Sequence, residues 1–279
     1  MSPFRRRIER RAATTGSHLI CSPRTSLASA PCALARSALV RLTAGPGATA
    51  ESIANLPGQV YGLRYHPSGD LIAAIPDQDK LVKVSRTGQV TDFVTGLGTP
   101  NGVYVDESGN TYVTEFGGAK VDRIAPDGTK TVLVSGSASA QGANGVVLDA
   151  SKGILFYTEY QKGKIHRLQL TDANPTPTLV ATIPGAALDG MVLDACGNVY
   201  VVDQGSAKLY RVKVDETGSA AAAPELLASF PTGVANAQFG AGEGFDASKL
   251  YVTGNPGTVY ALDLGVGGAP VPQPADEER

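Results

Sequence analysis

The chain of 279 residues has no tryptophan, two methionines, three histidines and three cysteines. Cys21, Cys32 and Cys196 form no Cys-x-x-Cys pair and no cluster with histidine, which argues against a structural zinc site. The residues leave open whether Cys21 pairs with Cys32. No apolar run approaches the ~18 residues of a membrane-spanning helix. The chain has a net charge of −2 and therefore lacks the excess of basic residues that is typical of a nucleic-acid-binding protein. We expect neither a membrane span nor a nucleic-acid partner.

Lysine and acidic residues are scarce at the N-terminal end. Residues 1–48 contain eight arginines, no lysine and one acid, Glu9. Such a composition is typical of a targeting segment, so we expect a disordered or targeting-like tail that favours export to the periplasm or the medium. Residues 266–279 are rich in Gly, Pro and acids and predict a second disordered tail. Between the tails, residues 49–265 are predicted to form a single domain.

The part of the chain between the tails repeats. Each repeat starts with one residue, the anchor, followed by a small residue and an apolar strand. The anchors are spaced by 40, 43, 45 and 47 residues, and they are Tyr61, Asn101, Asn144, Asp189 and Asn236. A turn with Gly or Ser follows each apolar strand, as Asp106 to Gly109 shows for the second repeat.

Further strands with β-branched and aromatic residues complete each repeat, for example Thr111–Glu115, Lys120–Ile124 and Thr131–Val134 after Asn101. Four-stranded units of this length are typical of propeller blades. The sequence therefore predicts an all-β protein, a β-propeller with five countable repeats.

The fifth repeat lacks a fourth strand after Leu264. Glu51–Pro57 resembles the outer strands of other repeats, such as Leu227 to Pro231, in ending on an apolar residue and proline. We expect this N-terminal strand to supply the outer strand of the last blade by pairing antiparallel with Thr258–Leu262. Closure of this kind protects both ends of the ring.

Polar side chains coincide with the repeat phase. First strands line the axis of a propeller, so the five anchors are predicted to form a ring. Second strands return to the same face and place Glu115, Glu159 and Asp203 behind that ring. Two carboxamides and one carboxylate, from Asn101, Asn144 and Asp189, are oxygen ligands suited to Ca²⁺ or Mg²⁺. Asn-Gly and Asp-Gly are also ordinary turn chemistry, which is the alternative.

Three blocks resemble the SMP-30/gluconolactonase/strictosidine-synthase-like propellers: Asn101-Gly102, Asn144-Gly145 with Val146 to Asp149, and Leu188-Asp189-Gly190-Met191. The resemblance covers about residues 50–265, and NHL-repeat propellers share the style of blade start. The resemblance implies a six-bladed propeller with a divalent cation in the channel. Ca²⁺ is the expected ion, and Mn²⁺, Zn²⁺ and Mg²⁺ are the alternatives. Asn144, Asp189 and Asn101 would hold the cation, and Asp189 would transfer the proton in lactone hydrolysis. Tyr61 stands where the family has a glutamate.

Three interpretations follow. The first is a divalent-metal-dependent hydrolase of a lactone or small ester, a monomer with Tyr61, Glu115, Glu159, Asp203 and Asn236 around the metal or substrate. The second is a non-enzymatic NHL-type binding or scaffold propeller. The third is a glycoside hydrolase that uses Glu115, Glu159 and Asp203, although a stacking tryptophan is missing. No histidine falls in anchor phase, so no histidine base is expected.

Overall fold

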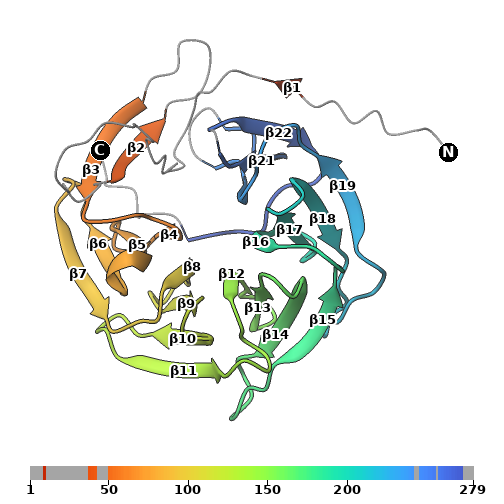
Figure 1. Ribbon diagram of the computed structural model, residues 1–279, viewed down its shortest axis with the longest axis horizontal. Coiled ribbons are helices and arrows are strands. Elements are labelled where there is room, and N and C mark those ends of the chain that lie inside the picture. Colours follow the sequence, from red (N-terminus) through yellow and green to blue (C-terminus); the bar gives the residue numbers. More distant parts are fainter. Residues whose placement is uncertain (1–8, 11–36, 43–49, 242–244, 256, 273–279) are drawn as a thin grey trace.

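The computed structural model describes residues 9–10, 37–42, 50–241, 245–255 and 257–272. Five four-stranded antiparallel sheets and one two-stranded sheet are arranged as the blades of a β-propeller around a central axis (Figure 1). The predicted all-β propeller with five four-stranded repeats is confirmed.

Blades 1 to 4 each run outward from the axis in sequence order, without crossover. Blade 1 consists of β4 (Leu63–Tyr65), β5 (Leu71–Ile75), β6 (Lys80–Val84) and β7 (Val90–Thr95), with a 3₁₀ turn at Pro76–Gln78. Blade 2 consists of β8 (Pro100–Val105), β9 (Thr111–Glu115), β10 (Lys120–Ile124) and β11 (Lys130–Ser135). Blade 3 consists of β12 (Ala143–Asp149), β13 (Ile154–Glu159), β14 (Lys164–Gln169) and β15 (Thr178–Thr182). Blade 4 consists of β16 (Leu188–Leu193), β17 (Val199–Asp203), β18 (Lys208–Val212) and β19 (Glu225–Ser229).

Blade 5 closes with a strand from the other end of the chain. β20 (Asn236–Phe239), β21 (Lys249–Thr253) and β22 (Val259–Asp263) are completed by β1 (Glu9–Arg10). Arg10 pairs with Tyr260 in an antiparallel register. An N-terminal strand does supply the outer strand of this blade.

The identity of that strand differs from the prediction. β3 (Ala50–Leu56), which covers Glu51–Pro57 almost completely, pairs with β2 (Ser37–Leu42) and not with Thr258–Leu262, so that pairing was wrong. Leu39 and Leu56 are buried together with the apolar residues of β5 and β6. The outer-strand pattern of β3 is genuine, but it belongs to a sixth, two-stranded sheet beside blade 1 (Figure 1).

Both predicted tails contribute described structure. Segment 1–48 contains β1 and β2, and the rest of it lies outside the described residues. At the other end, the Ala269 N–H donates to the Leu193 carbonyl, and the Ala195 N–H donates to the Gly267 carbonyl. Residues 267–269 therefore lie along the turn of blade 4, whereas 273–279 lie outside the described residues.

The second strands form the interior of the molecule. All side chains of β5, β9, β13 and β17 are buried, because both faces of these strands pack against neighbouring blades. The outer strands are exposed on one face, and β11 keeps mostly polar residues there. This burial is why β-branched and aromatic residues fill the second strands, and it means that the acids ending three of them are placed in the protein interior.

Candidate functional site

A β-bulge opens each of blades 2, 3 and 4 at its anchor. In blade 2, Pro100 faces Glu115 and Val103 faces Val113, so Asn101 and Gly102 together oppose one residue. The same shift occurs between Ala143 and Val146 in blade 3, and between Leu188 and Met191 in blade 4. In blade 1, Tyr61 and Gly62 likewise both bond to the backbone of one residue, Ala74, next to the Leu63–Ala73 pair. Blade 5 shows no such shift at Asn236 in its first pairing. Because bulges redirect side chains, Asn101, Asn144 and Asp189 form a geometric set that Tyr61 shares in its backbone and from which Asn236 differs.

The glycine after each anchor lets neighbouring blades approach. A Cβ on Gly102 would lie 2.2 Å from the carbonyl oxygen of Asn144, and one on Gly145 would lie 2.3 Å from that of Asp189. Gly62 meets the Asn101 carbonyl in the same way. Only glycine tolerates this approach. The anchors of blades 1 to 4 consequently lie side by side around the axis, in the order that the repeat phase predicts. In blade 5 the Gly190 N–H donates to the carbonyl of Ala235, so Asn236 lies one residue beyond the anchor position.

Two threonines of the second strands, which were not predicted as site residues, hold this contact in place. The Gly102 N–H donates to Thr114 Oγ1 at 2.8 Å, and the Thr114 hydroxyl donates to the Asn144 carbonyl of the next blade. In blade 3, the Gly145 N–H donates to Thr158 Oγ1 at 2.8 Å. The signal was a threonine directly before Glu115 and Glu159, buried in an otherwise apolar strand. These hydroxyls hold the backbone of the anchors in place.

Asp189 is the carboxylate of the anchor ring. Burial raises its pKa to about 7, and a hydrogen bond from the Gly190 backbone lowers it only in part. Within the described part of the chain no lysine, arginine or histidine forms an ion pair with it. A carboxyl group of this kind exchanges its proton near neutral pH, which suits a general acid or base.

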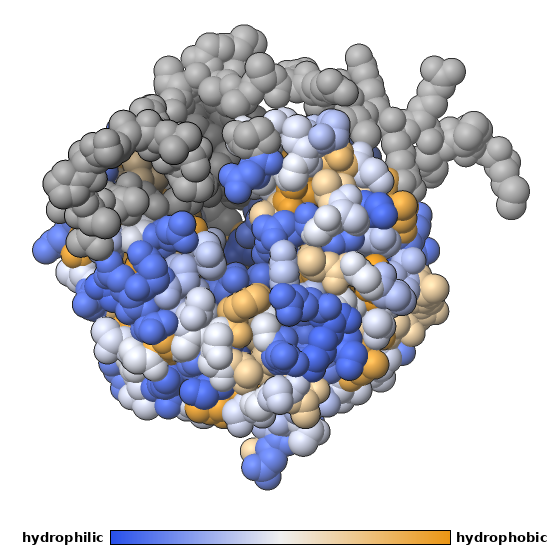
Figure 2. Space-filling view, in the orientation of Figure 1, coloured by the Kyte–Doolittle hydropathy of each residue, from blue (hydrophilic) through white to orange (hydrophobic). Residues whose placement is uncertain are grey.

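The other anchors differ in how much they face solvent. Asn144 is almost completely buried, whereas Asn101 is partly exposed. Tyr61 is 50% exposed. Asn236 Oδ1 accepts a hydrogen bond from the N–H of Ala237 at 2.8 Å, so this side chain folds back on its own backbone. Hydrophilic residues line part of the depression near the axis in Figure 2.

The acids at the ends of the second strands bind loops. Each carboxylate accepts a hydrogen bond from a backbone N–H. Glu115 accepts from Gly98 at 2.7 Å, Glu159 accepts from Gln141 at 3.1 Å, and Asp203 accepts from Ala187 at 2.9 Å. Each acid faces the residue before the anchor, because the bulge begins there. They share the anchors' end of the blades, but their described contacts tie down the segment that leads into each first strand.

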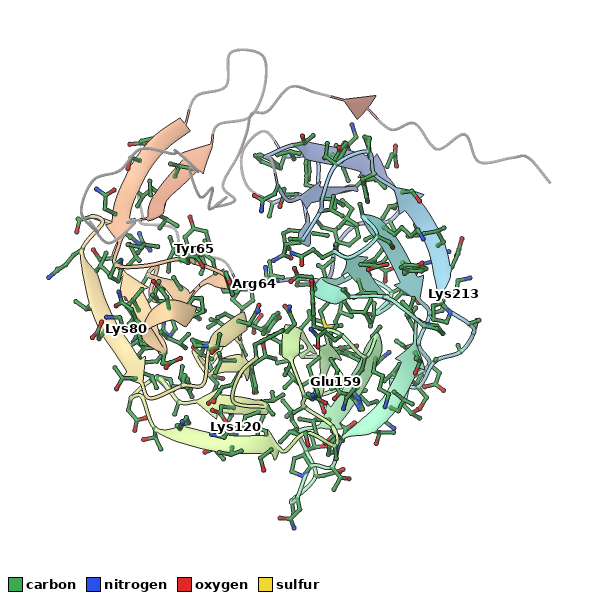
Figure 3. The ribbon with its side chains drawn as sticks, in the orientation of Figure 1. Arg64, Tyr65, Lys80, Lys120, Glu159 and Lys213 are labelled. Carbon is green, nitrogen blue, oxygen red and sulfur yellow. The ribbon has the colours of Figure 1, made fainter. Side chains whose placement is uncertain are left out.

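Glu159 has the densest set of partners. Lys162 Nζ lies 3.0 Å and His166 Nε2 lies 2.8 Å from its carboxylate oxygens. Burial favours the neutral acid, but the hydrogen bonds from Lys162 and His166 outweigh it and lower the pKa of Glu159. His166 stacks on Tyr157 at a ring distance of 5.3 Å. In Figure 3, Glu159 lies within blade 3 and away from the axis.

Asp122 is a fully buried acid that was not among the predicted site residues. Burial, and after it the neighbouring Glu115, raises the pKa of Asp122 to about 7. The pKa of Glu115 is lowered, because hydrogen bonding to Asp122 and to the Gly98 N–H outweighs the opposite effect of burial. Lys130 Nζ lies 3.7 Å from Glu115 and 3.9 Å from Asp122. The alternation in β10 places Asp122 on the buried face, a signal that the sequence contains.

The side-chain oxygens of the anchor ring are ligands of the type that a hard divalent cation prefers, but only Asp189 among them carries a negative charge. Asn101, Asn144 and Asp189 supply amide and carboxylate oxygens, which Ca²⁺ and Mg²⁺ prefer. Among the residues that the structure describes, no three His, Cys, Asp or Glu side chains gather as a metal cluster. Any cation held here would depend on the two carboxamides and on Asp189 in its ionised form.

Comparison with solved structures places this fold among known propellers. A protein assigned as a gluconolactonase superposes with a TM-score of 0.68 at 18% identity, covering 96% of this chain and 95% of that one. A gluconolactonase from Xanthomonas campestris gives 0.65 at 17%, covering 82% and 78%. A catalytically inactive virginiamycin B lyase from Staphylococcus aureus, solved with quinupristin, gives 0.61 at 16%, covering 81% and 73%.

The molecule therefore has an SMP-30/gluconolactonase-like propeller fold, shared with hydrolases and lyases. The chain belongs to the family described as a repeat of unknown function (DUF6923), whose model matches residues 58–241. Curated protein sequences gave no match. Within the described ranges, no helix is long and apolar enough to cross a membrane.

Proposed function

We propose that the anchor ring is the active site of a hydrolase that opens a lactone or small ester. The observation that carries this proposal is Asp189, a carboxyl group at a β-bulge on the axis whose pKa is raised to about 7. Burial without an opposing cation leaves this group near half ionisation at neutral pH. A general base is most effective when its pKa lies near the working pH.

The chemistry follows from this one group. The ionised Asp189 takes a proton from water as the water oxygen attacks the substrate carbonyl. The carbonyl then re-forms, the ester C–O bond breaks, and the proton passes from Asp189 to the departing alkoxide. Asn101 and Asn144 orient the substrate from the neighbouring bulges. With Asp189 they would hold a divalent cation, Ca²⁺ or alternatively Mn²⁺, Zn²⁺ or Mg²⁺, which when bound polarises a carbonyl oxygen.

The test measures the hydrolysis of a panel of γ- and δ-lactones. The protons released by the reaction are recorded with and without added divalent cations. Asp189→Asn keeps the size of the side chain but cannot accept the proton, so we expect kcat/KM to fall by about 10²- to 10⁴-fold. In the wild type, kcat/KM should rise with pH around an apparent pKa near 7.

Asp127→Asn is the matched control, because Asp127 is an exposed acid in the turn between β10 and β11. It should hydrolyse the panel as the wild type does. Hydrolysis by Asp189→Asn at the wild-type rate would exclude Asp189 as the base.

The half-exposed Tyr61 favours a second candidate, a binding propeller without catalysis. The phenol of Tyr61 offers a contact surface at the position where the SMP-30/gluconolactonase-like propellers have a glutamate. The ring as a whole then carries one carboxylate. A wild-type protein that hydrolyses no member of the panel, and whose melting temperature no divalent cation raises, would favour this alternative.

A further inference from the structure

Arg64 reaches the propeller axis from β4 (Figure 3). Its Nη1 donates a hydrogen bond of 2.5 Å to Oε1 of Gln238 on β20. The guanidinium also lies over the ring of Tyr104, with 5.8 Å between Cζ and the ring centroid. Arg64 thus connects the first strands of blade 1 and blade 5, the two blades between which the two-stranded sheet β2–β3 lies (Figure 1).

The charge of Arg64 has no counter-charge in the described part of the chain. Its described partners are an amide and an aromatic ring, both neutral. Burial lowers its pKa, and only the neighbouring Tyr104 acts in the opposite direction. Arg64 is partly exposed, but a cation that has lost much of its hydration without gaining an anionic partner is costly, so such charges are normally paired. Arg211 on β18, by contrast, does have such a partner in Glu225 at 2.6 Å.

The donor geometry indicates what would complete the site. A guanidinium carries five N–H donors in a planar fork, and Gln238 occupies one of them. Because Gln238 Oε1 accepts from Arg64, its amide nitrogen is left to donate. The planar fork matches the two oxygens of a carboxylate. One positive charge is neutralised by one negative charge, which favours a monoanion over sulfate or phosphate.

We propose that Arg64, with Gln238 and Tyr104, forms a binding site for a small organic carboxylate on the propeller axis. Arg64 lies three positions along the chain from the anchor Tyr61, a separation of roughly 10 Å in a strand. The site is therefore deeper along the axis than the anchor ring. Its existence does not depend on the hydrolysis proposed for Asp189.

The experiment measures melting temperature and heat of binding with acetate and gluconate, against chloride and sulfate at equal ionic strength. With a Kd of about 1 mM, ~100 mM carboxylate should raise the melting temperature of the wild type by about 5 °C or more. Chloride and sulfate should give a clearly smaller rise. Asp189→Asn should respond as the wild type does, which separates this site from the proposed catalytic one.

Gln238→Glu is the decisive variant. It places a permanent carboxylate against Arg64 in a side chain of the same size. We expect its melting temperature without ligand to exceed that of the wild type, and its response to acetate and gluconate to be lost. Arg64→Gln should also lose the response. Because Gln238→Glu adds an ion pair, it keeps the test valid if Arg64→Gln does not fold.

Arg123→Gln, which removes an exposed arginine of β10, controls for general charge effects and should keep the wild-type response. The proposal is overturned if neither carboxylate stabilises the wild type. It is also overturned if sulfate or chloride stabilises it equally, or if Gln238→Glu still responds to carboxylates.

Discussion

Asp189 and Glu159 end up at the same end of neighbouring blades with opposite surroundings. Glu159 is fully buried and receives hydrogen bonds from a backbone N–H, a lysine and a histidine, and its pKa is lowered. Asp189 sits on a bulge at the axis without an ion pair among the described residues, and its pKa is raised. A buried carboxylate that is fully bonded belongs to the framework, whereas one left without a cation is available for chemistry. Four substitutions can test this contrast.

Glu159→Ala should have the largest effect. It leaves the Gln141 N–H, Lys162 and His166 without their shared acceptor inside blade 3. We expect a loss of about 3 kcal/mol in the free energy of unfolding, measured by urea denaturation at pH 7. Asp189→Asn under the same conditions should stay within ~1 kcal/mol of the wild type or be more stable. Equal losses in the two variants would contradict the contrast.

Gly145→Ala tests the spacing that holds the ring. Its Cβ would lie 2.3 Å from the Asp189 carbonyl oxygen, so blades 3 and 4 must separate. We expect a destabilisation of about 1–3 kcal/mol together with a fall in any activity that depends on Asp189. Gly267→Ala, whose Cβ would meet its nearest atom at 3.4 Å, serves as the control. A wild-type unfolding curve for Gly145→Ala would show that the blades do not touch here.

Asp122→Asn tests the acid pair behind the ring. The pKa of Asp122 is about 7 in the folded protein against an ordinary 3.8. The folded state therefore binds the extra proton between about pH 4 and pH 7, and this contribution to stability is lost as pH rises through that window. Measured against the wild type, the variant should gain stability from pH 5 to pH 8 by about 2–3 kcal/mol. A difference that is constant with pH would refute the raised pKa.

Ala207→Gly should have the smallest effect. Ala207 adopts a left-handed conformation with φ of 52° at the turn that Asp203 helps to hold. Glycine relieves this conformation, and we expect a gain of about 0.5–1 kcal/mol by urea denaturation. The reverse change at the corresponding turn of blade 3, Gly163→Ala, should destabilise, because its Cβ would lie 2.2 Å from the Ile183 carbonyl oxygen. If both changes act in the same direction, the backbone conformation is not the cause.

Much of the fold could be predicted because its signals are local. Period-two strands, turn residues and the spacing of the anchors define each blade within about 45 residues. The pairing of the chain ends could not be predicted in this way. β3 has the pattern of an outer strand, but nothing within it says which strand it will face. β1 has two residues in an arginine-rich segment, too few for any pattern.

The site was predictable in position but not in detail. The repeat phase gives Asn101, Asn144 and Asp189 their common place, and the structure brings their backbones together. Counting along an ideal hairpin also places Glu115 and Glu159 beside the anchors. The bulge shifts the register by one residue, so these acids face Pro100 and Ala143 instead. The charge state of Asp189 and of Arg64 depends on burial by other blades, which the spacing alone does not reveal.

The pairing of β1 with β22 has a consequence for the order in which the molecule forms. During synthesis, Glu9 leaves the ribosome 252 residues before its partner Ala261. Blades 1 to 4 contain only neighbouring strands and can fold in turn as they emerge. Blade 5 has three strands until β1 pairs with β22. Its outer edge is the last part of the ring to be covered, and for that interval it is open to pairing with another chain.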